Sequence, residues 1–277
     1  MDKSFPGKCV FLSAMKLLII IFSLMLCGCN VIDVHPYDCN INGERDINRR
    51  NITRIEQALI GKQEFTFAFI SDTQRWYDQT EDAVADINRR EVDFVLHGGD
   101  LTDFGITKEF LWQRDILCRL NVPWVTVIGN HDCLGSGEQA FEAVFGEQNF
   151  HFTAGNVLFV CLNTNAMEFN YSTPVPDFGF LEKLIKNIPP NVEKTVFLMH
   201  ARPFAYGFNN NVAQIFDYYV RSFPNVQFCL FGHEHSIMQE DLFNNGTTYY
   251  GVSNIDKHKY YIFKVKENGY EYEIVEF

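Results

Sequence analysis

The sequence is poor in basic residues. Its 23 Lys and Arg are outnumbered by 35 Asp and Glu, so the chain of 277 residues carries a formal net charge of -12. Such a charge repels phosphate backbones at long range, which argues against non-specific binding to a nucleic-acid polymer. An anionic small molecule would need a local positive charge, such as a metal ion, to be drawn in.

The chain also lacks an apolar run of the roughly 18 residues that a membrane-spanning helix needs. The run from Leu17 to Cys27 is shorter, follows Lys16 and ends before Gly28, which is typical of a secretory signal peptide rather than an uncleaved anchor. Leu26-Cys27-Gly28-Cys29 resembles the bacterial lipobox, whose last Cys is acylated. We therefore expect residues 1–28 to be a lipoprotein signal peptide. Cys29 would then anchor the protein in a lipid bilayer of the bacterial cell envelope, with the outer membrane favoured.

Cysteines are few beyond this segment, and their five positions fit neither a zinc ribbon nor a disulfide framework. Cys161 and Cys229 lie within apolar runs, so we expect them to be buried thiols. An oxidising envelope leaves room for one disulfide. The other three are Cys39, Cys118 and Cys133.

No internal repeat, low-complexity stretch or linker interrupts residues 65–277, and a hydrophobic content of 47% is enough for one large core. We expect one domain there, preceded by a tether and lead-in segment over residues 29–64. The lead-in has Ile52, Ile55 and Leu59 at helical spacing, which predicts a helix before the domain.

Short apolar runs alternate with amphipathic segments along residues 65–277. The runs are rich in β-branched and aromatic residues, as buried strands are, and the carboxyl-terminal third alternates like antiparallel strands. This order predicts an α/β domain in which a mixed sheet is closed by a second sheet. The expected strands are 65–70, 92–96, 122–128, 157–162, 196–199 and 226–231, and the expected helices are 80–90, 107–120, 137–145, 178–187 and 212–222.

Nearly every predicted strand ends in a possible metal ligand. Because the carboxyl ends of strands converge on one crevice in open α/β sheets, residues far apart in the chain can meet there. A single Asp after a strand is more often a helix cap or turn former, so the ordered series carries the prediction. In chain order the series is Asp72 and Gln74, Asp100 and Asp103, Asn130, His131 and Asp132, His200, and His233 and His235.

The last pair of this series is the most specific. Side chains two positions apart in an extended segment point the same way, which predicts that His233 and His235 form a ligand pair. The other histidines are expected to be satisfied core or surface residues, namely His35, His97, His151 and His258.

Together these residues resemble the motifs of the calcineurin-like metallophosphoesterase family, in the order D-x-H, G-D-x-x-D, G-N-H-D/E, H and G-H-x-H. The resemblance covers Phe65 to about Ile237. It departs from the family in the first block, where Gln74 occupies the histidine position. The matching blocks are Asp72-Thr73-Gln74, Gly99-Asp100-Leu101-Thr102-Asp103, Gly129-Asn130-His131-Asp132, His200 and Gly232-His233-Glu234-His235.

The resemblance implies a four-layer α-β-β-α sandwich with two mixed β-sheets and a centre of two divalent metal ions. The ions would be Mn²⁺, Fe²⁺, Zn²⁺ or Mg²⁺, with Mn²⁺ favoured because Gln74 offers a neutral, hard oxygen. One ion would be held by Asp72, Gln74, Asp100 and His235, and the other by Asp100, Asn130, His200 and His233.

The family's chemistry implies hydrolysis of a phosphomonoester or phosphodiester with a metal-bridging hydroxide as nucleophile. His131 would face the leaving-group oxygen as general acid, and Asp103 would hydrogen-bond its other ring nitrogen and keep it cationic. Arg75 and Arg202 follow ligand positions and are candidates to contact the substrate phosphate, although a surface salt bridge explains each equally well. The loop over residues 163–177 is a candidate lid.

Two further functions stay open on the sequence. Family members with Gln in the position of Gln74 include ADP-ribose and CDP-alcohol pyrophosphatase-like enzymes, so a nucleotide-diphosphate pyrophosphohydrolase is the alternative within the enzyme class. A surface lipoprotein that binds a ligand without turnover is the alternative outside it, and the presence of Asp100, Asn130 and His131 argues against it. We expect a monomer that acts on a phosphate-ester small molecule.

Overall fold

The structure is a computed structural model that describes residues 15–20, 22–23, 38–39, 41 and 43–277. The chain divides into two compact units, Met1–Pro36 and Tyr37–Phe277, and every strand among the described residues lies in the second. Cys29, the predicted lipidation site, lies outside the described residues. No helix within the described ranges combines the length and the apolar character needed to cross a bilayer.

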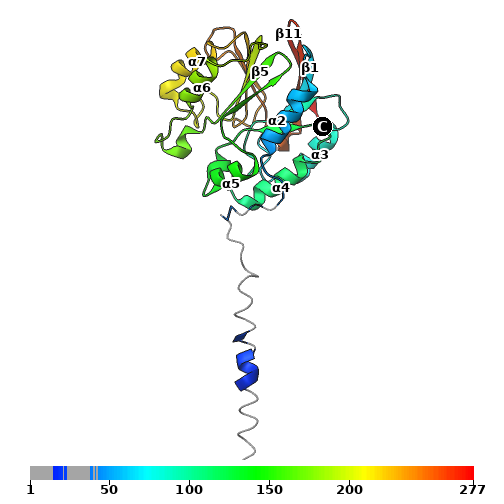
Figure 1. Ribbon diagram of the computed structural model, residues 1–277, viewed down its shortest axis with the longest axis vertical. Helices are drawn as coiled ribbons and strands as arrows, with labels where there is room; N and C mark the ends of the chain where they lie inside the picture. Colours follow the sequence, from blue (N-terminus) through cyan, green and yellow to red (C-terminus); the bar gives the residue numbers. More distant parts are fainter. Residues whose placement is uncertain (1–14, 21, 24–37, 40, 42) are drawn as a thin grey trace, which may run out of the picture. The chain divides into compact units, whose positions relative to one another are not determined.

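Two mixed sheets form the body of the second unit (Figure 1). In the first sheet, of order β11-β10-β1-β2-β3, three parallel strands are flanked by an antiparallel pair. Its strands are β1 (Phe65–Ile70), β2 (Phe94–His97), β3 (Trp124–Thr126), β10 (Lys259–Lys266) and β11 (Gly269–Glu276).

The second sheet has the order β4-β5-β6-β7-β9-β8, in which the four inner strands are parallel and each edge strand is antiparallel to its neighbour. The predicted sandwich of two mixed sheets is therefore confirmed. Its strands are β4 (Phe150–Ala154), β5 (Val157–Leu162), β6 (Lys194–Met199), β7 (Val226–Phe231), β8 (Met238–Glu240) and β9 (Thr248–Gly251).

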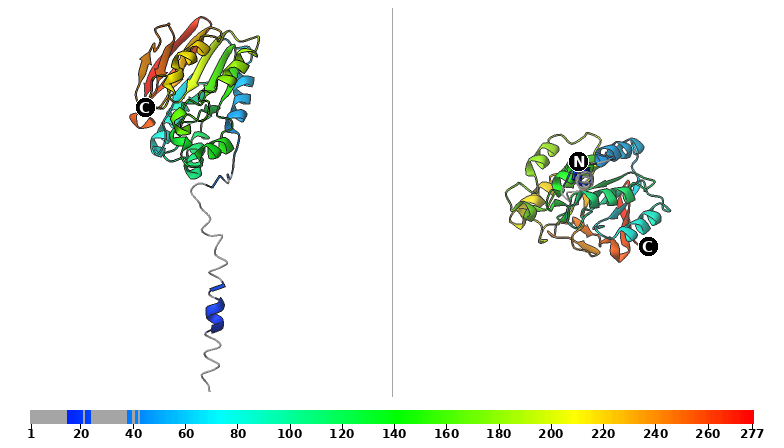
Figure 2. Two further views of the ribbon diagram at one scale, coloured as in Figure 1. Left: turned by 90° about the vertical axis from the view of Figure 1, so that its left-hand side faces the viewer. Right: turned by 90° about the horizontal axis from the view of Figure 1, so that it is seen from below.

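Helices cover both outer faces of the sandwich, and α6 and α7 lie on the side away from α3 and α4 (Figures 1 and 2). The side chains of β5 to β7 alternate between the inner core and the layer under α6 and α7, because successive residues of a strand point to opposite faces. The helices are α2 (Ile47–Ala58), α3 (Tyr77–Ile87), α4 (Thr107–Leu117), α5 (Gly137–Val144), α6 (Phe178–Ile185) and α7 (Ala213–Val220).

Aromatic side chains fill the space between the sheets. The ring of Phe159 from the second sheet lies 5.6 Å from the rings of both Phe67 and Phe94 in the first. Phe228 and Phe263 stack across the same interface at 4.7 Å. Burying each such ring contributes roughly 1.5–3 kcal/mol. The two sheets are thus held together by apolar contacts. The polar residues considered below lie at the ends of the strands.

The predicted lead-in helix, α2, packs as part of the compact unit. Ile55 and Leu59 join the main core. The buried side chains of Asn48 and Asn51 donate to the main-chain carbonyls of Thr126 and Trp124, at 2.8 and 2.7 Å. The helix therefore covers the open margin of the sandwich, against β3 and β4.

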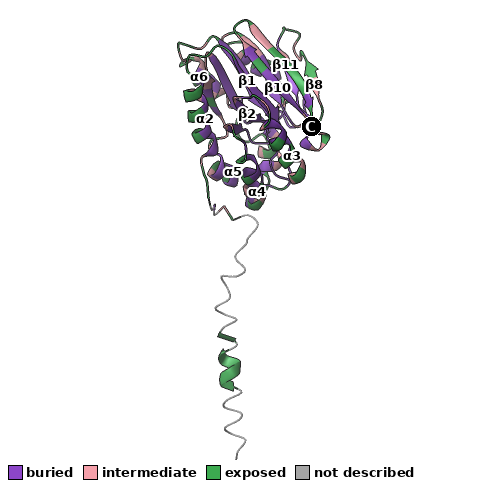
Figure 3. Ribbon diagram, turned by 90° about the vertical axis from the view of Figure 1, so that its right-hand side faces the viewer, coloured by how far each residue is buried: buried purple, intermediate pink, exposed green. Residues whose placement is uncertain are grey.

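Two strands escaped the sequence prediction, β4 and β8, and both lie at sheet edges. In β4 the exposed His151 alternates with Phe150 and Phe152, and β8 has only three partly exposed residues. Figure 3 shows the contrast between the buried central strands and the exposed outer strands β8 and β11. Edge strands are short and polar on their open side, which weakens the apolar signal used to find them.

Candidate metal centre

The predicted ligands meet at the carboxyl ends of the parallel strands. Asp72 follows β1, Asp100 follows β2, and His200 follows β6. Each of these three buried side chains offers a ligand atom within 4.8 Å of the other two. They come from two different sheets, so the site is built across the top of the sandwich.

One half of the site is formed around Asn130. The side-chain oxygen of Asn130 lies 3.0 Å from Nε2 of His200 and 2.9 Å from Nδ1 of His233. His200 is fully buried, and the carbonyl of Gly98 lies 2.8 Å from its Nδ1. A carbonyl only accepts hydrogen bonds, so Nδ1 carries the proton and Nε2 faces the site. We call these three residues, Asn130, His200 and His233, the closed half.

The other half is more open to solvent. Nε2 of His235 lies 3.2 Å from Oδ1 of Asp72, and the His235 side chain is 42% exposed. The side-chain nitrogen of Gln74 lies 3.4 Å from Oδ2 of Asp100, a weak contact that brings the amide next to this carboxylate. We call Asp72, Gln74 and His235 the open half.

Asp100 stands between the halves. Its Oδ1 lies 3.4 Å from Nε2 of His200 and accepts a hydrogen bond from the main-chain nitrogen of His131 at 2.9 Å, while Oδ2 faces Gln74. This is the arrangement expected for a carboxylate shared by two ions.

The backbone is strained where it presents these side chains. Five of the seven predicted ligands have a positive φ, between 37° and 68°: Asp72, Gln74, Asp100, His233 and His235. Left-handed conformations of non-glycine residues are uncommon and cost of order 1–3 kcal/mol each. The extended conformation predicted for His233 and His235 is therefore wrong, and each ring reaches a different half of the site.

Two glycines are required by close approach. A Cβ on Gly129 would lie 2.1 Å from Oδ1 of Asp100, and a Cβ on Gly232 would lie 2.7 Å from Oδ2 of Asp72. Neither position has room for a side chain, because these loops cross directly against the two carboxylates.

The charges of the site call for a cation. Burial lowers the pKa of His200, but the charges of Asp100 and Asp72 outweigh it and raise the pKa to about 10. Burial together with the charge of His200 lowers the pKa of His233 to about 4. The charges of the buried carboxylates thus keep a proton on the nearest imidazole, that of His200. A metal ion bound at this place would balance the same negative charges.

The residues present fit a pair of divalent ions. Oδ1 of Asp72 is buried, and its 3.2 Å contact with Nε2 of His235 is an ion pair that lacks hydrogen-bond geometry, so no described residue donates a hydrogen bond to this oxygen. A buried carboxylate oxygen without such a partner is costly unless an ion contacts it. Carboxylate, amide and imidazole donors suit Mn²⁺, Fe²⁺, Zn²⁺ and Mg²⁺.

Comparison with known proteins agrees with this geometry. The family model for calcineurin-like phosphoesterases matches residues 65–236. The chain belongs to this family. Its members depend on dinuclear metal centres, and in this chain Asp72, Asp100 and His200 form a cluster that could hold a metal ion.

Individual relatives of the chain are distant. A 3′,5′-cyclic-nucleotide phosphodiesterase of Nostoc is 26% identical over 155 residues, which cover 53% of this chain and 57% of that one. The uncharacterised protein YvnB of Bacillus subtilis is 22% identical over 221 residues, covering 70% of this chain. The matches thus span about half of the first relative and 17% of the second.

A solved structure shares the fold. A dimetal phosphatase from Danio rerio superposes with a TM-score of 0.58 at 14% identity, covering 76% of this chain and 98% of that one. At such low identity the likeness concerns the sandwich and leaves the substrate open.

The predicted role of Asp103 needs a correction. Its main-chain carbonyl, not its carboxylate, lies 2.8 Å from Nδ1 of His131. The carboxylate instead pairs with Arg75, whose Nε lies 3.0 Å from Oδ1 of Asp103. A main-chain carbonyl fixes the ring of His131 but supplies no full charge, so the carboxylate of Asp103 does not hold His131 cationic through a direct contact.

Both arginines predicted to contact substrate, Arg75 and Arg202, are engaged with carboxylates. Arg75 is 62% exposed while bound to Asp103. Arg202 is nearly buried, lies 3.4 Å from Glu234 and stacks over the ring of Phe231. The surface ion pair weighed for Arg75 is thus present, and contact with substrate by either arginine stays a prediction.

Two further polar residues support the site: Asp132, which the sequence placed in the strand-end series, and Gln113, which was not singled out from the sequence. The carboxylate of Asp132 accepts hydrogen bonds from the main-chain nitrogens of Leu101, Thr102 and Gly129, and so ties the Asp100 loop to the Asn130 loop. Burial, followed by the charge of Asp100, raises its pKa to about 7. The buried side chain of Gln113 donates to the main-chain carbonyl of Gln74 at 2.6 Å.

Proposed function

We propose that the protein is a metal-dependent hydrolase of phosphate esters, with a phosphodiester or phosphomonoester as substrate. The observation that supports it best is the meeting of Asn130, His200 and His233 within 3.0 Å around one amide oxygen, beside the buried carboxylates of Asp72 and Asp100. These residues come from separate strand ends, so their convergence is not a by-product of one local turn.

The closed half and Asp100 would hold one ion, and the open half and Asp100 the other. When bound, two such ions polarise a phosphate and acidify a water molecule near neutral pH. The protein would contribute by fixing the donor atoms in place. The left-handed backbone at Asp72, Asp100 and His233 costs conformational energy, which is typical of residues held in place for a function. Mn²⁺ is the favoured metal, because the amides of Gln74 and Asn130 offer neutral, hard oxygens.

His131 is suited to protonate the leaving group. Its Nδ1 faces the carbonyl of Asp103 and therefore carries a proton. The general acid would be the imidazolium form, in which Nε2 carries a second proton. Its main-chain nitrogen is bound to Asp100, which places the residue next to the metal centre, and its side chain is partly exposed. Nε2 is left to donate a proton to a departing oxygen.

The charge of the site favours a diester within this class. A phosphodiester carries one negative charge, whereas a monoester carries up to two, and the protein is itself strongly acidic. Arg75 and Arg202 are already paired with carboxylates, so the ions would be the main attraction for phosphate. The name of the Nostoc relative, a cyclic-nucleotide phosphodiesterase, points in the same direction.

A nucleotide-diphosphate pyrophosphohydrolase of the ADP-ribose or CDP-alcohol type is the second candidate. Gln74 favours it, because this residue departs from the family's histidine and reaches the shared carboxylate of Asp100. The two candidates differ in the leaving group and not in the metal centre.

The proposal includes an anchor in the cell envelope. The lipobox-like sequence that ends at Cys29 supports acylation there and attachment to a bacterial membrane. Metabolic labelling with palmitate would test it, since a Cys29→Ala variant that still carried label would rule out this residue as the acceptor.

A substrate panel tests the enzymatic proposal. The protein would be stripped of metal, reloaded with Mn²⁺, Fe²⁺, Zn²⁺ or Mg²⁺, and assayed with a nitrophenyl monoester, a bis-nitrophenyl diester, a cyclic nucleotide and ADP-ribose. We expect Mn²⁺-dependent turnover, fastest with a diester. Stoichiometric metal uptake without turnover of any substrate would instead favour a ligand-binding protein.

A further inference from the structure

The segment Asn163-Thr164-Asn165 directly follows β5, a central strand of the second sheet. It forms the start of the candidate lid loop. All three residues are polar, yet none is more than 1% exposed. Buried polar groups are costly unless they are hydrogen-bonded. Their bonds lead to two different loops of the metal centre.

Thr164 is bonded to the His200 loop. Its hydroxyl oxygen accepts a hydrogen bond from the main-chain nitrogen of Ala201 at 3.0 Å. Ala201 directly follows His200, so this bond fixes the backbone at the point where the imidazole leaves β6.

Asn165 is bonded to the Asn130 loop. Its side-chain nitrogen donates to the main-chain carbonyl of Ile128 at 2.9 Å, two residues before Asn130. The same nitrogen and the main-chain nitrogen of Asn165 both donate to Oδ1 of Asn163, at 3.0 and 2.9 Å. The conformation of the segment is thereby fixed from within.

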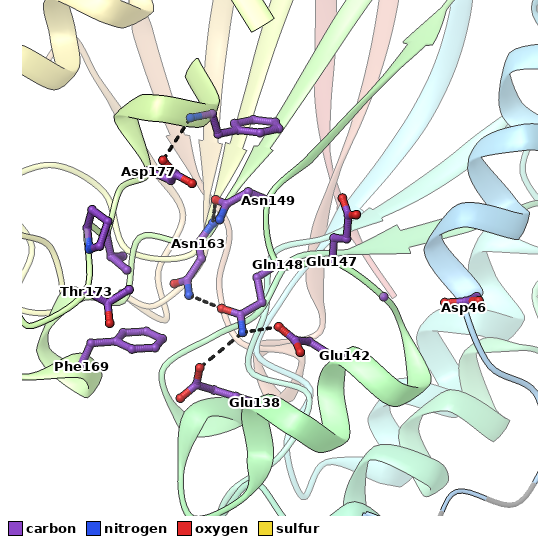
Figure 4. Close-up of a pocket in the computed structure, with 14 residues that line it drawn as sticks. Asp46, Glu138, Glu142, Glu147, Gln148, Asn149, Asn163, Phe169, Thr173 and Asp177 are labelled. Carbon is purple, nitrogen blue, oxygen red and sulfur yellow. Dashed lines mark hydrogen bonds between the residues drawn. The ribbon is translucent and has the colours of Figure 1, made fainter. Parts of the chain in front are cut away.

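The segment is also supported from behind (Figure 4). The side chain of Asn163 donates to Gln148 at 2.6 Å, and Gln148 donates in turn to Glu142 of α5 at 3.0 Å. These residues line a cavity of about 640 Å³ beside α5 and the loop after β5. This series of hydrogen bonds therefore connects the segment to helix α5.

We infer that Thr164 and Asn165 are positioning residues for the metal ion held by Asp100 and the closed half. Asn130 comes from the end of the first sheet and His200 from the second, yet their ligand atoms must lie 3.0 Å apart. One segment bonded to both loops sets that distance. The inference rests on the proposed function, because it takes these residues to be metal ligands.

Stability alone is a poor explanation for the segment. No described residue forms a hydrogen bond with Oδ1 of Asn165, although the atom is buried, and an unpaired buried acceptor lowers the stability of the fold. An apolar side chain would cover the core without that cost, but it would leave the Ile128 carbonyl without its donor.

The chain offers a matched control in Thr195. It is also a buried threonine, and its hydroxyl bonds to the main-chain carbonyl of Pro224 at 2.8 Å. It lies at the start of β6, five residues before His200, which is about 16 Å along a strand. Thr195→Val removes a similar buried bond far from the metal centre.

The test measures Mn²⁺ binding to the full chain in two ways. Calorimetry gives the heat of binding, and electron paramagnetic resonance gives the concentration of free Mn²⁺. We expect Thr164→Val to weaken the tighter of two sites by about 10- to 100-fold, and Thr164→Ser, which keeps the hydroxyl, to restore it. Thr195→Val should lower the melting temperature of the metal-free protein and leave both Mn²⁺ affinities unchanged. Asn165→Ala should reproduce the loss and provides an independent variant if Thr164→Val does not fold.

Two outcomes separate this inference from the proposed function. Wild-type Mn²⁺ affinities in Thr164→Val and Asn165→Ala would overturn the inference alone. A wild-type protein that takes up no Mn²⁺ would overturn the proposed function and the inference with it.

Discussion

The two halves of the metal centre are built differently. In the closed half, His200 is fully buried and is held by Gly98 on one ring nitrogen and Asn130 on the other. In the open half, His235 is 42% exposed, and Gln74 approaches Asp100 only to 3.4 Å. Both halves nonetheless share Asp100.

This difference indicates that the two halves bind their metal ions with different affinities. Ligands that are fixed before binding lose little conformational freedom when an ion arrives, whereas exposed ligands must be ordered at that moment. We therefore expect the closed half to bind its ion tightly and the open half to exchange its ion with solvent. The departure from the family motif, Gln74, lies in the half that has less support.

Removing the shared ligand should abolish the contrast altogether. In Asp100→Asn both halves lose their common carboxylate, so metal uptake should fail and turnover should fall by at least about 10⁴-fold, since metal ions supply several kcal/mol of transition-state stabilisation. Metal analysis and initial rates would measure this. Asp93→Asn, at the other end of β2, is the matched control. Retention of two ions by Asp100→Asn would show that this residue is not shared.

Removing the acid should spare both halves. His131→Ala should lower the rate by about 10²- to 10⁴-fold with a poor leaving group, and much less with nitrophenolate, which departs without a proton. Metal content should equal that of the wild type, and His151→Ala, at an exposed position of the edge strand β4, should change nothing. Equal losses with good and poor leaving groups would exclude the role of general acid.

Chelation should separate the halves by affinity. A limiting chelator should remove one ion first, and Gln74→His should tighten the weaker site by about tenfold and shift its preference towards Zn²⁺ or Fe²⁺, because imidazole is the softer ligand. Competition with a metal-sensitive dye would report both affinities. Unchanged selectivity in Gln74→His would mean that Gln74 does not contact the metal.

Proton release should identify the closed half. The pKa of His200 is raised to about 10, so without metal its ring is protonated at pH 7, and it must lose a proton to bind an ion through Nε2. Uptake of the tighter ion should therefore release about one proton, and its affinity should rise with pH. Calorimetry in two buffers of different ionisation enthalpy would count the protons. A heat of binding that did not depend on the buffer would contradict this protonation state.

The smallest effect is expected at Arg75. An ion pair with one exposed partner contributes up to about 1 kcal/mol, so Arg75→Gln should change the rate by about fivefold at most. Arg54→Gln, on the exposed face of α2, is the control. A loss of a hundredfold or more, confined to kcat/KM, would show that Arg75 leaves Asp103 and binds substrate.

Much of this site follows from the sequence because its predicted ligands are side chains at strand ends. The bounds of β1, β5 and β7 agree with the apolar runs that predicted them. The polar residues that follow the strands are the signal from which the metal centre was predicted. Asp103 was misassigned for a physical reason, since a main-chain carbonyl leaves no mark on a sequence. Thr164 and Asn165 do carry the same signal, polar residues directly after a buried strand, but they lie within the expected lid loop.

Anomalous diffraction from crystals loaded with Mn²⁺ tests the central claim most directly. At one equivalent we predict a single strong peak bounded by Asp100, Asn130, His200 and His233. At saturation we predict a second peak beside Asp72, Gln74 and His235, on the other side of Asp100. A first peak in the open half would reverse the proposed order of the two sites, and no peak within reach of Asp100 would contradict the account of the metal centre itself.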